Sequence, residues 1–209
     1  MRTGVLLEIE EVLFDTLPLR TTALQQALDA EGVTLGARSI ALAHTGLPAV
    51  VALSHLPAIT ALDETGRDLV LHRATDLGSA AIAQGAATLH TAVAGAIETL
   101  ASEFPIAVVT RGTRADALQL LEMAGLEVYI STIRSLATMR ERDQHEAWAS
   151  ARAALHVDRA VALAPAPLLA GARAAGLQVI RAGGTHGGTP VPPATTVAAM
   201  DPAQVISLF

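Results

Sequence analysis

The sequence predicts an α/β fold in which helices cover both faces of a parallel β-sheet. In the second half of the chain, short apolar segments alternate with longer segments of helical pattern, which is typical of strand–helix–strand units. The strand segments are apolar throughout rather than alternating with polar residues, and this indicates burial on both faces. By contrast, Leu19–His90 shows helical patterns and no strand alternation, so we expect a helical insertion there.

The order of elements follows from the position of the apolar runs and of the residues that end helices. Gly125 and Gly176 follow helical segments and are suited to left-handed helix caps. The predicted strands are Thr3–Glu8, Ile106–Thr110, Glu127–Ile130, Ala160–Leu163 and Gln178–Ile180. The predicted helices are Thr22–Glu31, Glu64–Ala83, Thr91–Ser102, Arg114–Ala124, Asp143–Leu155, Leu168–Ala175 and a short one at Asp201–Phe209, after a loop at Ala182–Thr196.

The composition limits the classes of function. Of the 209 residues, 51% are hydrophobic and 2% aromatic, so alanine, leucine and valine must fill the core. The formal net charge of -6 argues against a nucleic-acid or anionic-membrane surface. All 14 basic residues are arginines and cysteine is absent, which excludes lysine chemistry, disulfides and thiolate ligands. We expect a cytoplasmic protein without a membrane span, since the charge-free runs are broken by proline or polar residues.

Two glutamates mark the end of the first predicted strand. Glu8 and Glu10 are two residues apart, which would direct both to one face if the extended conformation persists. Ligands of open parallel sheets bind beyond the carboxyl ends of the strands. From the residues alone, the pair could serve as nucleophile and general acid/base, hold a cation, or form a solvated acidic turn.

The segment Val5–Thr16, with the sequence VLLEIEEVLFDT, resembles the first motif of the haloacid dehalogenase-like phosphohydrolases. That motif is an apolar strand followed by Asp-x-Asp-Gly-x-Leu-x-Asp-Thr. Glu8 and Glu10 take the places of the nucleophile and the acid/base, and Glu11 replaces the glycine. Asp15 and Thr16 match the pattern, and we assign them a structural role at a turn and helix cap.

Two further motifs of the resemblance fall later in the chain. Phe104–Gly112 resembles the strand that ends in a phosphate-binding hydroxyl, with Thr110 as the hydroxyl and Arg111 directly after it. Arg142 takes the place of the basic residue, usually lysine, of the third motif, although neither proline of that motif is present. Because arginine is a good clamp for phosphate and carboxylate, Thr110, Arg111 and Arg142 are candidates for binding a small phosphorylated or anionic ligand.

The fourth motif of the resemblance has lost its acidic residues. The segment Ala160–Leu169 is in register with it, but the usual acids fall at Ala164 and Leu168. No carboxylate occurs between Asp158 and Asp201. Family members use Mg²⁺, which relies on carboxylate oxygens in octahedral geometry. We therefore expect no cofactor and no metal ligands in this chain.

The resemblance implies a three-layer, Rossmann-like core with an inserted helical cap, in the subgroup of phosphoglycolate phosphatase and β-phosphoglucomutase. The expected core comprises residues 1–16 and 88–209, and the expected cap comprises residues 17–87. The charge-free run Ser39–Leu62 in the cap predicts either a packed core or an apolar surface for a protein partner or a homodimer. The histidines lack the spacing of a helical metal site, so none is assigned as a ligand.

Three hypotheses for the function follow. The first is a catalytically degenerate homologue of these phosphatases that acts as a binding or protein-interaction module. The second is an atypical hydrolase or phosphotransferase that uses Glu8 with little or no Mg²⁺ dependence, and with Arg142 in place of the metal. The third is an architectural subunit of a larger complex. The first is preferred because the strand and helix frames are preserved while the residues of the resemblance are lost together at Glu8, Glu10, Glu11, Ala164 and Leu168. The extra methylene of a glutamate also moves the reactive oxygen, and a misplacement of about 1 Å can cost about a hundredfold in rate.

Overall fold

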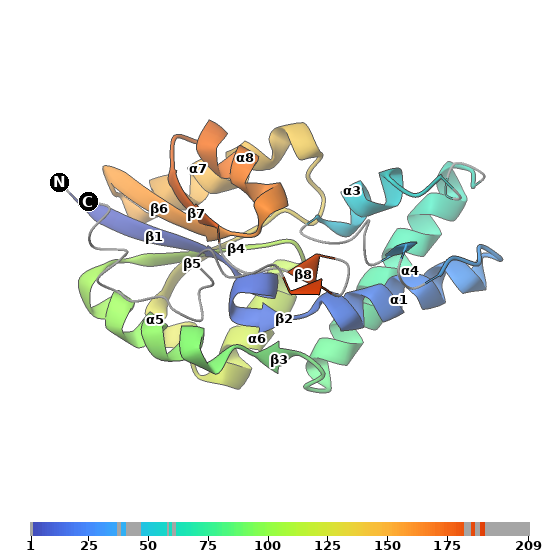
Figure 1. The fold of residues 1–209 in the computed structure, drawn as a ribbon, viewed down its shortest axis with the longest axis horizontal. Coiled ribbons are helices and arrows are strands. Elements are labelled where there is room, and N and C mark those ends of the chain that lie inside the picture. The colour runs from blue at the N-terminus through green and yellow to red at the C-terminus, as the bar shows by residue number, and fades with distance from the viewer. Residues whose placement is uncertain are drawn as a thin grey trace.

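The computed structural model describes residues 2–36, 39–40, 47–57, 59, 62–181, 185–186 and 189–190. Its centre is a parallel sheet in the order β5-β4-β1-β6-β7. These strands are Ile130–Ser135, Ile106–Thr110, Thr3–Glu8, Arg159–Ala164 and Gln178–Arg181, respectively. Figure 1 shows the sheet between two layers of helices, so the predicted three-layer α/β core is confirmed.

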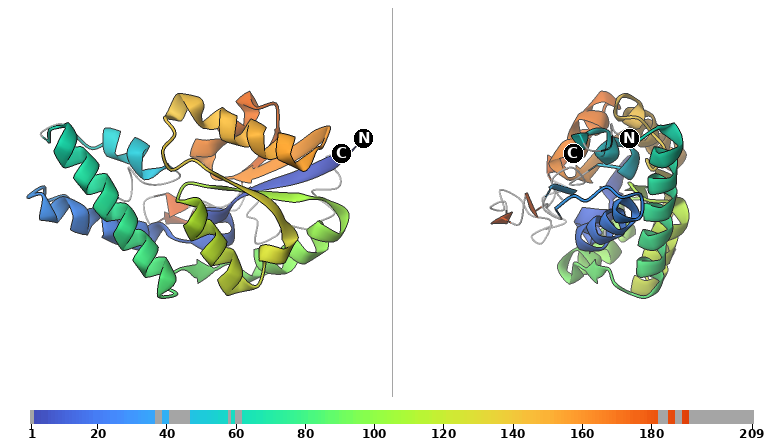
Figure 2. Two further views of the ribbon diagram at one scale, coloured as in Figure 1. Left: turned by 180° about the vertical axis from the view of Figure 1, so that it is seen from behind. Right: turned by 90° about the vertical axis from the view of Figure 1, so that its right-hand side faces the viewer.

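Two helices cover each face of the sheet. On one face lie α5 (Thr91–Glu103) and α6 (Arg114–Ala124), and on the other lie α7 (Gln144–Leu155) and α8 (Leu169–Ala174) (Figures 1 and 2). Successive side chains of β1 alternate between the two sides: Val5 and Leu7 pack in the α5/α6 cluster, whereas Leu6 packs with Trp148 of α7. Burial on both faces explains why the strands are apolar throughout.

A separate helical layer lies beyond the carboxyl end of β1. It consists of α1 (Leu17–Ala30), α3 (Ala49–Ser54) and α4 (Glu64–Ala83), and α1 packs beside α4 (Figure 1). All three helices fall in the stretch predicted as the cap, and they share an apolar cluster with Leu24, Leu53 and Val70. Five of the described large apolar side chains of the run Ser39–Leu62 are buried and contribute to the core, namely Ile40, Val51, Leu53, Leu56 and Ile59. Leu47, Val50 and Leu62 are partly buried.

Several local predictions need correction. Residues 127–129 form a 3₁₀ turn (Glu127–Tyr129), and β5 begins only at Ile130, so the predicted strand Glu127–Ile130 was wrong. The stretch Leu19–His90 is not entirely helical, because β3 (Thr88–Leu89) pairs with β2 (Phe14–Asp15). Both β2 and β3 are two residues long, too short for an alternating pattern to be visible.

Other predictions on helix ends are confirmed. Gly125 (φ 67°) and Gly176 (φ 74°) have the left-handed conformation expected after α6 and α8. The prediction of a loop over Ala182–Thr196 was wrong in part, because the short strands β8 (Thr185–His186) and β9 (Thr189–Pro190) pair antiparallel there. The predicted helix Asp201–Phe209 lies outside the described residues. No helix of the described ranges is long and apolar enough to cross a membrane.

Candidate functional site

The candidate site lies at the topological switch point of the sheet. From β1 the chain proceeds to β4 on one side, whereas β6 returns to the other side of β1. The carboxyl end of β1 therefore faces the place where open α/β sheets bind ligands. In the register of the sheet, Glu8 pairs with Val109, so Thr110 follows one residue beyond on the adjacent strand. The predicted proximity of the first and second motifs is thus observed.

Glu8 is the last residue of β1, and its side chain caps the turn that follows. Its Oε1 accepts a hydrogen bond from the backbone N–H of Glu10 (3.1 Å), and its Oε2 accepts one from that of Glu11 (2.9 Å). The residue has no exposed surface. The carboxyl group is therefore used locally, as a helix cap, on both of its oxygens.

The extended conformation does not continue beyond Glu8. Residues Ile9–Leu13 form a one-turn π-helix, η1, in which every residue is buried. The premise that strand geometry alone would direct Glu8 and Glu10 to one face was therefore wrong. Both side chains nevertheless reach the end of β4, because the π-helix turns the chain there. π-helical turns are rare in proteins, and those that occur are frequently found at functional sites.

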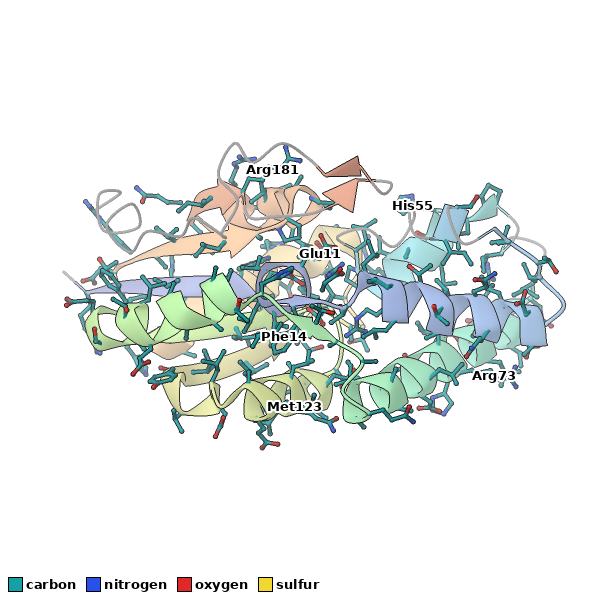
Figure 3. All side chains as sticks on the ribbon, turned by 60° about the horizontal axis from the view of Figure 1, so that its bottom comes forward. Glu11, Phe14, His55, Arg73, Met123 and Arg181 are labelled. Carbon is teal, nitrogen blue, oxygen red and sulfur yellow. The ribbon has the colours of Figure 1, made fainter. Side chains whose placement is uncertain are left out.

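Arg111 fills the space between the acidic side chains. Its Nε donates to Oε1 of Glu8 at 2.8 Å, and its Nη1 is 2.8 Å from Oε1 of Glu11. Only 2% of the Arg111 side chain is exposed. Glu11 itself lies in the middle of the molecule, where the sheet meets the helical layer (Figure 3). Among the residues that the structure describes, no group accepts a hydrogen bond from Nη2 of Arg111.

Glu10 connects three parts of the chain. Its Oε1 accepts from the Thr110 hydroxyl (2.5 Å), the Gly112 N–H (2.7 Å) and Nη2 of Arg20 in α1 (3.0 Å). Its Oε2 accepts from the Arg111 N–H at 2.9 Å. A Cβ at position 112 would clash with Arg20 Nη2 and would lie 2.9 Å from Glu10 Oε1, so any other residue there would displace the Arg20 side chain from Glu10. We refer to Glu8, Glu10, Glu11, Arg20 and Arg111 as the buried ion cluster.

The charges of the cluster push the two strand-end glutamates in opposite directions. Burial raises the pKa of Glu8 to about 8; Arg111 opposes this shift, and the charges of Glu10 and Glu11 reinforce it. Burial also acts to raise the pKa of Glu10, but Arg20 and Arg111 outweigh it and lower that pKa to about 2. These shifts leave Glu8 protonated at neutral pH and Glu10 ionised.

The pKa of Arg111 responds to the same interactions. Burial alone would lower it, but Glu8, Glu11 and Glu10 together hold the pKa of Arg111 above its ordinary value. The guanidinium therefore stays charged at every pH at which the protein folds. A permanent positive charge is thus fixed at the carboxyl end of β1.

The remaining predicted site residues lie apart from the cluster. Arg142 belongs to a 3₁₀ turn, η4 (Glu141–Asp143), and 74% of its side chain is exposed. It pairs with the adjacent Asp143 at 3.4 Å, and the structure does not bring it to Glu8 or Thr110. Ala164 and Leu168, which replace the family's acids, are fully buried and pack in the cluster around Trp148. That element contributes apolar packing and no oxygen ligand.

Asp15 and Thr16 have the structural role expected of them at the start of α1, but Asp15 rather than Thr16 caps the helix with its side chain. Thr16 is at the N-cap of α1, but its side chain makes no capping bond and donates to the Glu10 carbonyl at 3.3 Å. Asp15 Oδ1 instead accepts from the Leu17 N–H, also at 3.3 Å.

The donor set does not suit the Mg²⁺ that the resemblance implies. Both oxygens of Glu8 and of Glu10 already accept hydrogen bonds from backbone or side-chain donors. Throughout the described ranges, no group of three or more His, Cys, Asp or Glu residues is arranged to hold a metal ion. The guanidinium of Arg111 lies against Glu8 and Glu11, and that of Arg20 lies against Glu10.

Sequence reasoning missed two residues of the site. Arg20 is ten residues from Glu10 and sits on a helix, so no local pattern links the two. Asp116, whose Oδ2 is 4.0 Å from Arg20 Nη2, had a readable signal: Thr113 and Asp116 have capping-box spacing and form that box at the start of α6.

Known structures resemble this one over most or all of its length. A haloacid dehalogenase-like hydrolase from Streptococcus pneumoniae has a TM-score of 0.76 at 16% identity, covering 100% of this chain and 98% of its own. A protein from Lactobacillus plantarum assigned as a phosphoglycolate phosphatase also has a TM-score of 0.76, at 18% identity, with 99% and 98% covered. The structure of CbbY from Rhodobacter sphaeroides in complex with phosphate has a TM-score of 0.68 at 20% identity, with 89% and 88% covered.

The chain therefore has the fold of the haloacid dehalogenase-like hydrolases, as the motifs predicted. No protein-family model matches the sequence, and no curated protein is similar to it at a significant level. At these identities the structural similarity establishes the fold alone, and the chemistry has to be argued from the site.

Proposed function

We propose that this protein is a non-catalytic relative of the haloacid dehalogenase-like phosphatases that acts as a binding or protein-interaction module. One observation carries the proposal. The carboxyl groups at the nucleophile and acid/base positions, Glu8 and Glu10, are fully buried and hydrogen-bonded on both oxygens.

A nucleophile has to present a free oxygen to its substrate within about 3–3.5 Å of the reacting atom. Glu8 would first have to release two backbone N–H groups and the guanidinium of Arg111. Each buried donor that is left without an acceptor costs about 1–3 kcal/mol, so the release of these groups is unfavourable. Arg111 and Thr110, the candidate phosphate ligands, are likewise bonded to the cluster's own carboxyl groups. These bonds favour a structural role for the cluster.

The test is a screen of phosphoesters with and without Mg²⁺, using wild type and Glu8→Gln side by side. We expect no turnover above that of a buffer blank in either protein. Turnover by the wild type that is lost in Glu8→Gln would overturn the proposal. Arg142→Gln is a matched control, because its exposed side chain lies apart from the cluster.

A second candidate, the atypical hydrolase, is favoured by the raised pKa of Glu8. A carboxyl group with a pKa of about 8 is protonated at neutral pH and could act as a general acid. If this candidate is right, the rate should fall as the pH rises through about 8. The same profile should be absent in Glu8→Gln.

The binding role has its own measurements. Gel filtration at several protein concentrations detects self-association through the helical layer, and a pull-down from the native host detects a partner or a larger complex. Titration with inorganic phosphate tests the small anionic ligand at Thr110 and Arg111, with Arg142→Gln as the control outside the site. A monomer that captures no partner and binds no phosphate would contradict the proposed binding role.

A further inference from the structure

Arg111 is surrounded by carboxyl groups, as a bound cation would be. Two of its nitrogens contact two different acidic residues, Glu8 and Glu11, each at 2.8 Å. Its own backbone N–H donates to a third, Glu10, at 2.9 Å. One residue therefore interacts with Glu8 at the end of the first strand and with the two glutamates that follow it, Glu10 and Glu11.

The local geometry leaves the carboxylate oxygens poorly suited to a metal. A divalent cation takes oxygen ligands at about 2.0–2.6 Å, and each ligand must direct a lone pair at it. Glu8 accepts three hydrogen bonds and Glu10 accepts four. Only 2% of the Arg111 side chain is exposed, so its aliphatic part also fills space beside these carboxyl groups. A metal ion would have to displace the guanidinium.

We propose that the guanidinium of Arg111 takes the place of a divalent cation in this protein, and that it balances the buried carboxyl groups so that the site neither requires nor binds a metal ion. The guanidinium is a single positive charge with planar, fixed donors, so it satisfies carboxylates by hydrogen bonds rather than by coordination. The site would thereby be permanently filled from within the chain. This inference rests on the structural role of the cluster in the proposed function.

The first experiment measures metal binding by the full-length wild type. MgCl₂ and MnCl₂ are titrated by calorimetry, with Mn²⁺ included because carboxylate oxygens suit Mn²⁺ as they suit Mg²⁺. The melting temperature is measured with each metal and with EDTA. We expect no saturable heat and no change in melting temperature. Saturable binding that disappears in Glu8→Gln would overturn the inference.

The second experiment tests whether Arg111 acts through its charge. Arg111→Met keeps much of the side-chain volume but leaves the carboxyl groups without their cation. We expect its folding equilibrium constant to fall by about a hundredfold or more. Adding Glu11→Gln removes a carboxylate that Arg111 no longer balances, and Glu8→Gln fixes the neutral form of the Glu8 side chain, so the triple variant should regain about tenfold or more of that loss.

The outcomes separate charge from packing. If Arg111 served only to fill space, the losses would add, and the triple variant would be less stable than Arg111→Met; that result would overturn the inference. If Arg111→Met does not fold, the triple variant should still fold, and its failure to do so would count equally against the idea. Arg134→Met is the matched control, because Arg134 bonds to Ser150 and Thr132 outside the cluster.

Failure of this inference differs from failure of the proposed function. Turnover of a phosphoester without metal binding would overturn the proposed function and leave the role of Arg111 intact. Metal binding lost in Glu8→Gln, without turnover, would do the reverse. The two sets of measurements share only the variant Glu8→Gln.

Discussion

Glu8→Gln and Glu10→Gln make the same chemical change at two fully buried positions, and we expect very different losses of stability. Glu10 is ionised in the folded protein, since its pKa is lowered from 4.5 to about 2. At about 1.4 kcal/mol per pKa unit, this shift corresponds to about 3 kcal/mol of stabilisation of the charged form. Glutamine cannot carry that charge.

Glu10→Gln also disrupts hydrogen bonds. Four donors converge on the Glu10 carboxylate, from Thr110, Arg111, Gly112 and Arg20. An amide offers one oxygen, and its NH₂ group would face at least one of these donors. Each buried donor left without an acceptor costs about 1–3 kcal/mol. The expected loss is therefore about 4–6 kcal/mol, a large part of the 5–15 kcal/mol by which domains are typically stable.

Glu8→Gln should be much milder at neutral pH. Because the pKa of Glu8 is about 8, the folded protein already holds this side chain in its neutral form. Glutamine resembles that form, and its oxygen can still accept from a backbone N–H. We expect a loss of about 1–2 kcal/mol or less.

The assay is urea unfolding at neutral pH, followed by circular dichroism and by the fluorescence of Trp148, the single tryptophan, which is fully buried. Coincident transitions from the two probes would justify a two-state analysis. Glu122→Gln on the exposed side of α6 controls for the loss of one carboxylate. Equal losses for Glu8→Gln and Glu10→Gln, or a larger loss for Glu8→Gln, would refute this account of the charges.

Two further predictions concern pH and packing. Because the pKa of Glu8 is raised, this residue contributes stability that is fully present below pH 4.5 and is lost as the pH rises through about 8. Because the pKa of Glu10 is lowered, that residue contributes stability that is lost as the pH falls from 4.5 towards about 2. The urea midpoint should therefore be lower at about pH 9 than at about pH 5 in wild type, and Glu8→Gln should lack most of this decline. Gly112→Ala should destabilise the protein by about 1–3 kcal/mol, because the added Cβ would clash with Arg20. Gly95→Ala should stabilise it by about 0.5–1 kcal/mol, because Gly95 lies within α5 with open space around it. Similar midpoints for the two alanine variants would contradict the tight packing at Gly112.

The sequence predicted the core elements well where burial produces a strong local pattern. Strands Thr3–Glu8 and Ile106–Thr110 were predicted with their observed bounds, as were helices Glu64–Ala83 and Arg114–Ala124. Predictions were weaker where the pattern was short or half-buried. Strand β5 has several partly exposed residues, which explains why its start was misplaced.

The candidate site was predicted in position and not in chemistry. The motifs correctly brought Glu8, Glu10, Thr110 and Arg111 to one edge of the sheet. Their spacing gave no indication that Arg111 would turn inward, and register alone suggested Arg142 as the basic partner. Whether a guanidinium points into a cluster or into solvent depends on the charges around it, and those come from distant parts of the chain.

By itself, then, the sequence determined the α/β core, the order of its elements and the loss of acidic residues at Ala164 and Leu168. It could do so because hydrophobic periodicity and residue identity are local properties of the chain. The tertiary structure alone decided that Arg20 and Arg111 neutralise the glutamates after β1, and that the apolar run of the helical layer packs inward. Ion pairs and burial depend on which segments meet in space, and residues as far apart as Glu8 and Arg111 meet only when the sheet has formed.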